Sequence, residues 1–265
     1  MKTTFIQTHI GKIAVHIKQG PSEKTPLLFL HGVYFDYHLW DYQMQAIDDR
    51  TVMAIDDRTV MAIDMPHHGA SKEITTTRWN LDDCATMLME LMDHLRLTTV
   101  FAVGHSWGSM TLLRAATMEP SRFVGVLLCN MPFQRATPMQ RFIFRMQHTL
   151  LSFRGFYTLQ AAKALFGKSS LQKHPHLVDY MKQSMNRLTN REIKLIDRKV
   201  IFEANDATGL IANLKIPALA LKGEEDYLSA PPGMKTIVIQ GGHISPLEQP
   251  EAVLTCIQDM IHDRT

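Results

Sequence analysis

The sequence predicts an α/β fold in which a mostly parallel central sheet is flanked by helices and interrupted by one helical insertion. Three observations support this prediction. Short apolar runs typical of buried strands alternate with amphipathic stretches typical of helices. Strand patterns stop between residues 131 and 205, where only helical patterns occur. The same segment carries 13 lysine and arginine residues against four acidic residues, a net charge of +9, whereas the rest of the chain is at −7.

We therefore expect an α/β core formed by residues 1–130 and 206–265, with residues 131–205 inserted after the sixth strand as a helical cap. A chain of 265 residues can bury a core of this size. Its longest apolar runs are far shorter than the roughly 18 residues that span a bilayer, and its first residues lack the pattern of an export signal. We expect a cytoplasmic protein without a membrane span.

The N-terminal part of the chain predicts an antiparallel hairpin and a buried strand. Residues 3–18 alternate apolar and polar side chains around a turn at Gly11-Lys12, which is typical of a hairpin. Residues 26–30 are apolar on both faces of a strand, as is usual at the centre of a parallel sheet. Residues 40–47 indicate a short helix.

An eight-residue segment is then duplicated. Residues 46–53 are repeated without change as residues 54–61, and residues 62–64 begin a third copy. Only one copy can occupy one strand position in the sheet. We predict a strand from Thr59 to Asp64, because this copy alone leads directly into the loop that begins at Met65. The other copy would extend the preceding helix or form a loop.

An amphipathic helix over residues 79–95 precedes the most informative motif, Gly104-His105-Ser106-Trp107-Gly108, which has the form G-x-S-x-G. The motif joins a predicted strand, residues 98–103, to a predicted helix, residues 109–116. So short a connection forces a sharp turn, which the glycines allow and which leaves the serine hydroxyl at its tip. The string alone is a weak signal, so a base, an acid and an oxyanion site must stand elsewhere in the chain.

The second half of the chain completes the alternation. Residues 123–129 indicate a buried strand, and Thr137-Pro138 indicates the start of a helix. Strand patterns return at residues 217–221 and 236–239, and a final helix is expected over residues 250–261.

Polar residues follow several of these strands, at the edge where ligands gather in open α/β sheets. His31-Gly32-Val33 follows the strand at residues 26–30. Glu224, Glu225 and Asp226 follow the strand at 217–221, and His243 follows the strand at 236–239. Serine, acid and histidine in this chain order are typical of one hydrolase arrangement.

Together these motifs resemble the α/β-hydrolase superfamily over nearly the whole chain. They are His31-Gly32 with Trp40 following, Asp64-Met65-Pro66-x-His68-Gly69-x-Ser71, the Gly104–Gly108 elbow, Gly223-x-x-Asp226, and Gly242-His243-x-x-Pro246-x-Glu248-x-Pro250. The duplication and His67, where the family usually has glycine, depart from the pattern. They concern the loop after Asp64 and leave the other motifs intact.

The resemblance implies a role for each residue. Ser106 would be the nucleophile, His243 the general base and then acid, and Asp226 the carboxylate that orients the imidazole. The backbone N–H groups of Val33 and Trp107 would form the oxyanion hole. The remaining polar residues of these loops are expected to be structural: Glu224 and Glu225 as solvated charges, His31 and His105 as hydrogen-bonding side chains.

In this superfamily an insertion after the corresponding strand forms a lid over the nucleophile, and residues 131–205 occupy that place. Its apolar residues are expected mostly to pack the lid helices together, with a few facing the substrate; they include Met139, Phe142, Phe144, Met146, Phe153, Phe156, Phe166, Met181 and Met185. We assign Tyr34, Met131, Phe133 and Met146 to the substrate pocket. The positive charge of the insertion would attract an anionic substrate or a membrane surface, or simply form solvated helix faces.

The sequence predicts a serine hydrolase that cleaves a small or medium carboxylic ester, lactone or thioester through an acyl-enzyme. Three alternatives stay open: a carbon–carbon bond hydrolase acting on an anionic substrate, a proline iminopeptidase-like enzyme, and a small-molecule receptor with the hydrolase fold. The second is kept because Gly104–Gly108 resembles the elbow of proline iminopeptidases. The partner is a small molecule, anionic or bearing an acyl chain; the oligomeric state is left open.

No cofactor, metal ion or nucleic acid is expected. Cys84, Cys129 and Cys256 are scattered and match buried apolar residues of a reducing compartment. The histidine pairs at residues 67–68 and 174–176 have no second ligand cluster nearby. The basic residues belong to an apolar helical segment without a nucleic-acid-binding motif.

Overall fold

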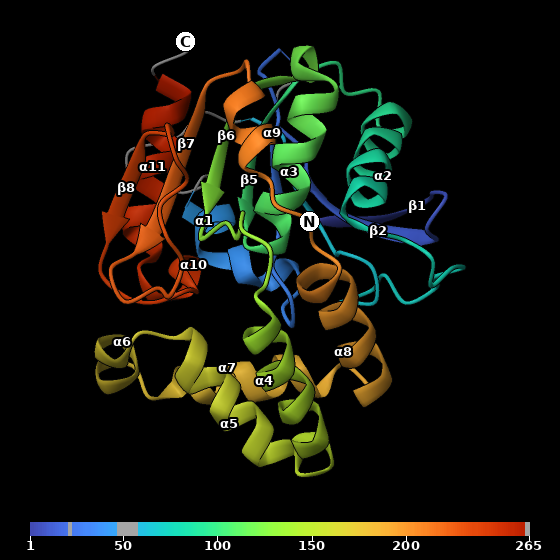
Figure 1. Cartoon of the computed structure of the whole chain (residues 1–265). Coiled ribbons are helices and arrows are strands. Elements are labelled where there is room, and N and C mark those ends of the chain that lie inside the picture. Colours follow the sequence, from blue (N-terminus) through green and yellow to red (C-terminus); the bar gives the residue numbers. More distant parts are fainter. Residues whose placement is uncertain (21–22, 47–57, 263–265) are drawn as a thin grey trace.

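In the computed structural model, which describes residues 1–20, 23–46 and 58–262, strands from both halves of the chain form one sheet (Figure 1). The strand order is β1-β2-β4-β3-β5-β6-β7-β8. β2 pairs with β1 and β4 in antiparallel orientation, and the remaining pairs are parallel. The predicted hairpin and mostly parallel sheet are thus confirmed. The strands are β1 Lys2–Gln7, β2 Lys12–Lys18, β3 Leu27–Leu30, β4 Val60–Ile63, β5 Val100–His105, β6 Phe123–Cys129, β7 Ala218–Gly223 and β8 Thr236–Ile239.

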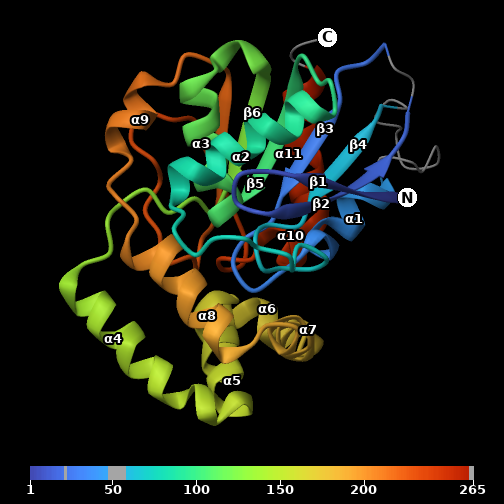
Figure 2. The ribbon, with the colours of Figure 1, turned by 90° about the vertical axis from the view of Figure 1, so that its right-hand side faces the viewer.

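Helices cover both faces of this sheet, α2 and α3 on one face and α1 and α11 on the other (Figures 1 and 2). β3, β4 and β5 lie in the middle, and every residue in them is buried. This explains why these strands are apolar on both faces. The helices of the core are α1 Asp41–Ala46, α2 Leu81–His94, α3 Trp107–Met118, α9 Thr208–Asn213, α10 Ser245–Glu248 and α11 Pro250–His262.

The copy of the duplicated segment that forms the strand is the one predicted. Val60–Ile63 is β4, and its register places Val60 beside Leu27 and Ile63 beside Leu30 of β3. Asp64 follows directly and donates its backbone N–H to the Ala14 carbonyl at 3.1 Å. The prediction for the other copy falls on residues 47–57, which lie outside the described residues.

Between β6 and β7 the chain, described throughout this stretch, forms helices and helical turns but no strand. α4 begins at the predicted position. Thr137 accepts a hydrogen bond from the Gln140 N–H at 3.2 Å, and the Gln140 side chain accepts one from the Thr137 N–H at 2.8 Å. These helices lie together beyond the carboxyl ends of the parallel strands (Figure 1). They are α4 Pro138–Thr149, α5 Arg154–Leu165, α6 Lys168–Lys173, α7 His176–Asn186 and α8 Asn190–Asp197.

The apolar residues of these helices divide into two groups. Phe166, Met181 and Met185 are buried, as expected of residues that pack the helices together. In α4 that expectation is wrong: none of its residues is buried, and Phe142 and Met146 are more than half exposed. The physical reason is that α4 lies at the outer margin of the helical layer (Figure 2), where only one of its faces meets the rest of the protein.

Close packing around Gly108 of the elbow leaves no room for a side chain, which predicts that substitution there destabilises the fold. A Cβ atom on Gly108 would lie 2.2 Å from the Leu30 carbonyl oxygen, whereas one on Gly155 of α5 would meet nothing within 4 Å. Gly108→Ala should lower the free energy of unfolding by about 3 kcal/mol. Gly155→Ala, the matched control within a helix, should raise it by about 0.5–1 kcal/mol. Urea unfolding measures both; equal stability of the two variants would contradict the packing argument.

Candidate active site

The turn between β5 and α3 presents Ser106 at the carboxyl edge of the sheet. Ser106 has φ 49° and ψ −108°, a strained conformation for a residue with a side chain. Neighbouring hydrogen bonds hold it there. The Ser106 N–H donates to the Cys129 carbonyl at 2.9 Å, and the Ser109 hydroxyl donates to the Gly104 carbonyl at 2.7 Å. The serine side chain therefore projects from a turn whose backbone is fixed on both sides.

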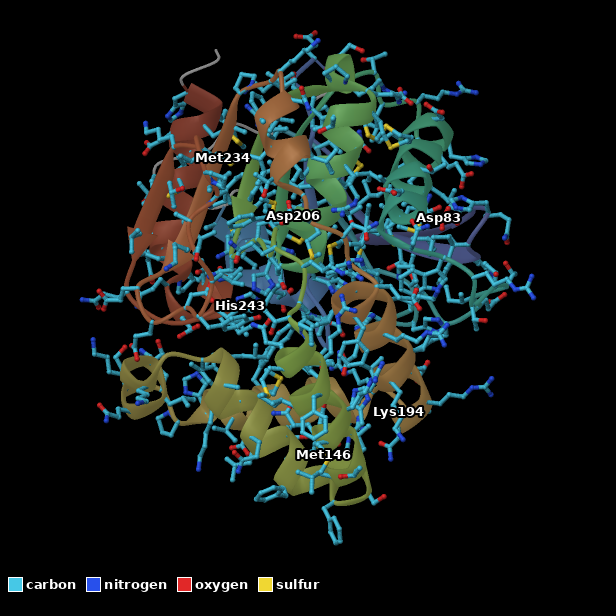
Figure 3. The ribbon with its side chains drawn as sticks, viewed as in Figure 1. Asp83, Met146, Lys194, Asp206, Met234 and His243 are labelled. Carbon is cyan, nitrogen blue, oxygen red and sulfur yellow. The ribbon has the colours of Figure 1, made fainter. Side chains whose placement is uncertain are left out.

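The structure brings the three predicted catalytic side chains together. The Ser106 hydroxyl lies 3.0 Å from Nε2 of His243, and Nδ1 of His243 lies 3.1 Å from Oδ1 of Asp226. All three residues are buried. His243 stands in the loop after β8, at the sheet edge that faces the helical insertion (Figure 3). A serine, an imidazole and a carboxylate in this hydrogen-bonding order can move a proton away from the hydroxyl.

Asn130 is a fourth member of this arrangement, and the sequence analysis missed it. Its side-chain amide donates hydrogen bonds to Oδ2 of Asp226 at 2.8 Å and to the Gly242 carbonyl at 3.2 Å. Burial acts to raise the pKa of Asp226, but hydrogen bonds from His243 and Asn130 outweigh it and lower this pKa below its ordinary value. Asn130 directly follows β6, and this position at the end of a strand is the signal by which the sequence could have indicated it.

The two backbone N–H groups predicted to form the oxyanion hole come from different segments: Trp107 directly follows Ser106, and Val33 lies in the loop after β3 and lines the same cavity as Ser106. The neighbouring donors are already engaged: the Gly108 N–H donates to the His31 carbonyl and the Tyr34 N–H donates to Nε2 of His68. For Val33 and Trp107, by contrast, the described part of the chain provides no hydrogen-bond acceptor. Their assignment stays a prediction, one that this difference supports.

Tyr34 links the loop after β3 to the helical insertion. Its hydroxyl donates to Oδ1 of Asp197 at 2.7 Å, and Oδ2 of Asp197 lies 2.8 Å from Nε2 of His148. The Ser184 hydroxyl donates to the Tyr34 carbonyl at 2.6 Å. Asp197 is fully buried, and burial raises its pKa although His148 and Tyr34 hydrogen-bond to it. No sequence motif marks Asp197 or His148, so these contacts were not predicted.

Three further histidines near the site are structural. His31 hydrogen-bonds the Gly32 carbonyl and accepts from the Met65 N–H, and His105 donates to the His243 carbonyl at 2.7 Å. The prediction of hydrogen-bonding roles for His31 and His105 is thus confirmed. Burial lowers the pKa of His31, lowers that of His68 strongly, and lowers that of His105 to about 3.

The buried histidines make stability depend on pH. Because the pKa of His105 is about 3 in the folded chain and about 6.5 in the unfolded one, only the unfolded chain takes up this proton as the pH falls from 6.5 towards 3. The stabilisation is therefore fully present above about pH 6.5 and is lost below it, by more than about 1 kcal/mol per pH unit. Urea unfolding at pH 7 and pH 5 measures the loss.

His105→Gln tests the contribution of this residue, because glutamine keeps a donor for the His243 carbonyl and does not titrate. The variant should show a smaller fall in unfolding free energy between pH 7 and pH 5 than the wild type. His174→Gln, at an exposed position in the insertion, is the matched control and should keep the wild-type dependence. An unchanged dependence in His105→Gln would contradict the argument.

A cavity of about 710 Å³ opens above the serine. Val33, Tyr34, Ser106 and His243 line it from the core, and Tyr34 is one of the residues assigned to the substrate pocket from the sequence. The insertion supplies most of the remaining wall, which includes Pro132, Gln134, Gln140, Ile143, Phe144, Gln147, Leu150, Phe156, Tyr157, Gln160, Ala161, Val200 and Ile201.

Three of the residues assigned to the substrate pocket from the sequence do not line this cavity. Met131 and Phe133 are buried in the core, and the cavity wall is formed instead by Pro132 and Gln134, the next residues along this extended stretch. Met146 is 54% exposed and lies in the helical layer away from His243 (Figure 3). α4 faces the cavity with Gln140, Ile143, Phe144 and Gln147, at the i, i+3, i+4 and i+7 positions of one helical face, and Met146 falls outside that face.

The cavity wall is uncharged. Among the described residues that line it there is no lysine, arginine, aspartate or glutamate; its polar groups are glutamine amides, tyrosine hydroxyls and the Ser106–His243 pair. The basic residues of the insertion therefore lie outside the wall. A buried ion would find no partner of opposite charge here, which makes its desolvation costly.

Two loops near the site make contacts that the sequence motifs do not indicate. His67, where glycine is usual, takes φ 70°, and the centroid of its ring lies 6.4 Å from that of the Trp79 ring. Glu225 was expected to be a solvated charge. It is exposed, as expected, and its carboxylate also accepts hydrogen bonds from the Lys168 and Ser169 N–H groups at the start of α6. It thereby ties the loop of Asp226 to the insertion.

The described residues contain no cluster of three or more histidine, cysteine or acidic side chains that could bind a metal ion. All three cysteines are buried and none forms a disulfide. No helix in the described ranges is both long enough and apolar enough to cross a membrane.

Comparison with known proteins agrees with this architecture. A thermophilic esterase from Thermogutta terrifontis has a TM-score of 0.83 at 24% identity, with all of both chains covered. The enol-lactonase from Burkholderia xenovorans LB400 has a TM-score of 0.80 at 19% identity, covering 98% of this chain and all of the other. At these identities the likeness shows the fold.

A curated relative, the dihydrolipoyllysine-residue acetyltransferase component of the acetoin cleaving system of Pseudomonas putida, is 29% identical over 119 residues, which are 44% of this chain and 30% of that protein. The chain thus spans only about a third of the length of the first curated relatives that it matches. The family model of the alpha/beta hydrolase fold, by contrast, matches residues 25–251. This chain is a member of the alpha/beta hydrolase fold family.

Proposed function

We propose that this protein is a serine hydrolase that cleaves a small or medium carboxylic ester, lactone or thioester through an acyl-enzyme. The observation that carries the proposal is the hydrogen-bonded chain Ser106–His243–Asp226, with distances of 3.0 and 3.1 Å, whose serine opens into the cavity. The proposal assigns Ser106, His243 and Asp226 the catalytic roles, Val33 and Trp107 the oxyanion donors, and residues 131–205 the role of a cap.

In the first half of the reaction, the Ser106 hydroxyl oxygen attacks the carbonyl carbon while Nε2 of His243 takes the hydroxyl proton. Asp226 accepts a hydrogen bond from Nδ1–H, which keeps Nε2 free to act as base and stabilises the imidazolium. The carbonyl oxygen becomes an oxyanion that the Val33 and Trp107 N–H groups would stabilise. When the carbonyl re-forms, the alcohol or thiol leaves with the proton from His243.

In the second half, a water molecule attacks the acyl carbon of the Ser106 ester. Nε2 of His243 takes a proton from the water, and the tetrahedral intermediate collapses with return of this proton to the serine oxygen. The products are the carboxylic acid and the unmodified enzyme. A lactone gives the hydroxy acid as its only product by the same steps.

The uncharged cavity wall favours a neutral substrate over those of the rival enzymes. A carbon–carbon bond hydrolase acting on an anion needs a cation near its pocket, and an aminopeptidase needs an acid for its substrate amine. Among the described lining residues neither is present. The hydrogen-bonded triad also supports catalysis over a receptor function, because a receptor has no need of an activated hydroxyl.

A matched pair of esters tests the proposal. We expect p-nitrophenyl butyrate to be hydrolysed with a kcat/KM at least about tenfold higher than that of the p-nitrophenyl monoester of succinate, since the second acyl group carries a carboxylate that must be desolvated. A fluorophosphonate should label Ser106. Absence of both ester turnover and labelling would defeat the hydrolase proposal, and preference for the succinate ester would favour the rival with an anionic substrate.

A further inference from the structure

The outer face of the insertion carries large apolar side chains that are exposed to solvent. Met139, Phe142 and Met146 of α4 are 66%, 60% and 54% exposed, and Phe153 just before α5 is 70% exposed. Together with Ile143 and Phe156, these residues form what we call the α4–α5 face. Half of the large apolar side chains with high exposure among the described residues belong to it. Apolar patches of this kind mark interaction surfaces.

The periodicity of α4 separates this face from the substrate cavity. Gln140, Phe144 and Gln147 line the cavity, whereas Met139, Phe142 and Met146, at i, i+3 and i+7, lie along an adjacent stripe of the helix. Ile143 belongs to both, since it lines the cavity and is 47% exposed. Phe156 of α5 is likewise exposed and part of the cavity wall. The α4–α5 face therefore adjoins the mouth of the cavity.

The charged residues of the segment that contains α4 and α5 have one sign. From residue 131 to residue 178 the chain has no aspartate or glutamate and seven lysine or arginine residues. Arg135, Arg145 and Lys163 among them are exposed. Because the cavity wall is uncharged, these cations act at the outer surface. An apolar stripe bordered by cations is the pattern of a helix that lies in the interface of an anionic membrane.

We propose that the α4–α5 face docks on an anionic phospholipid surface, with Phe142 and Met146 entering the headgroup region and the basic residues beside them contacting lipid phosphates. The orientation presents the mouth of the cavity to the lipid. A second copy of the chain is a poorer occupant, because a symmetric contact through this face would bring the same cations of both copies together.

Vesicle sedimentation tests the proposal without reference to catalysis. The full chain should bind vesicles of phosphatidylcholine mixed with phosphatidylglycerol, and bind vesicles of phosphatidylcholine alone at least about tenfold more weakly. Added salt should weaken the binding. The double variant Phe142→Ser/Met146→Ser should bind the anionic vesicles at least about tenfold more weakly than the wild type, and Arg145→Gln about fivefold more weakly.

Met118→Ser is the matched control, because Met118 is 51% exposed at the far end of α3, on the core. It should bind as the wild type does. Unfolding temperatures and turnover of a water-soluble ester should be unchanged in the double variant, so that loss of binding is separated from loss of structure and from failure of the hydrolase proposal. Absence of wild-type binding, equal binding to neutral vesicles, or a wild-type dimer in ultracentrifugation that the double variant abolishes would overturn the proposal.

Discussion

Ser106→Ala is expected to lower kcat for p-nitrophenyl butyrate by about 10⁴-fold to 10⁶-fold and to abolish labelling by a fluorophosphonate. The reason is that the attacking oxygen is removed while the cavity and the proposed oxyanion donors stay in place. Ser106 is buried at a turn held by backbone hydrogen bonds, so loss of its hydroxyl should leave the fold intact. Initial-rate kinetics and mass spectrometry of the labelled protein measure the two effects.

Ser109→Ala is the matched control. Ser109 lies one turn of α3 beyond the proposed nucleophile, Ser106, and its hydroxyl donates to the Gly104 and Cys129 carbonyls, at 2.7 and 3.0 Å. Its replacement should cost about 1 kcal/mol of stability and should retain labelling. If Ser106→Ala kept more than about one hundredth of the wild-type turnover, the nucleophile would have to be a different group.

Asp226→Asn is expected to lower kcat by about 10³-fold to 10⁴-fold with a small effect on KM. The carboxylate accepts a hydrogen bond from Nδ1–H of His243, which leaves Nε2 as the atom that faces Ser106 with a lone pair. An amide NH₂ group facing Nδ1 would favour the tautomer with its proton on Nε2, and a protonated Nε2 cannot accept the proton of the serine hydroxyl. An amide oxygen in that place would keep the tautomer but lose the charge that stabilises the imidazolium.

Glu224→Gln is the control for this variant, because it removes an acid from the same loop, two residues earlier, at an exposed position. It should leave kcat and KM unchanged. Comparable losses in the two variants would show that the loop's net charge, rather than the hydrogen bond to His243, supports the reaction.

The sheet, and the edge at which the proposed catalytic residues lie, could be predicted from the sequence because both depend on local rules. The choice of Asp226 over Glu224 and Glu225 as the acid rested on the family resemblance. A strand buried on both faces must be apolar throughout, and parallel strands bring their carboxyl ends to one edge, where Ser106, Asp226 and His243 then meet. The copy of the duplication that forms β4 followed from connectivity alone. These arguments needed no knowledge of packing between distant helices.

Packing within the insertion could not be obtained in this way. The amphipathic pattern of α4 indicates a helix with an apolar stripe, but it does not say whether a partner covers that stripe; here Phe142 and Met146 remain exposed. Likewise, a shift of one residue along an extended segment reverses its facing, and this placed Pro132 and Gln134, rather than Met131 and Phe133, in the cavity wall.

The contacts of Tyr34 have a consequence for building chimaeras within the family. Its hydroxyl donates a hydrogen bond to Asp197, and its carbonyl accepts one from the Ser184 hydroxyl. Two separate helices of the insertion therefore hold the residue adjacent to Val33. Transplanting a foreign segment in place of residues 131–205 would leave that tyrosine without either anchor unless the graft carried equivalents. Exchanging this segment to alter substrate selectivity therefore requires a matching substitution at position 34.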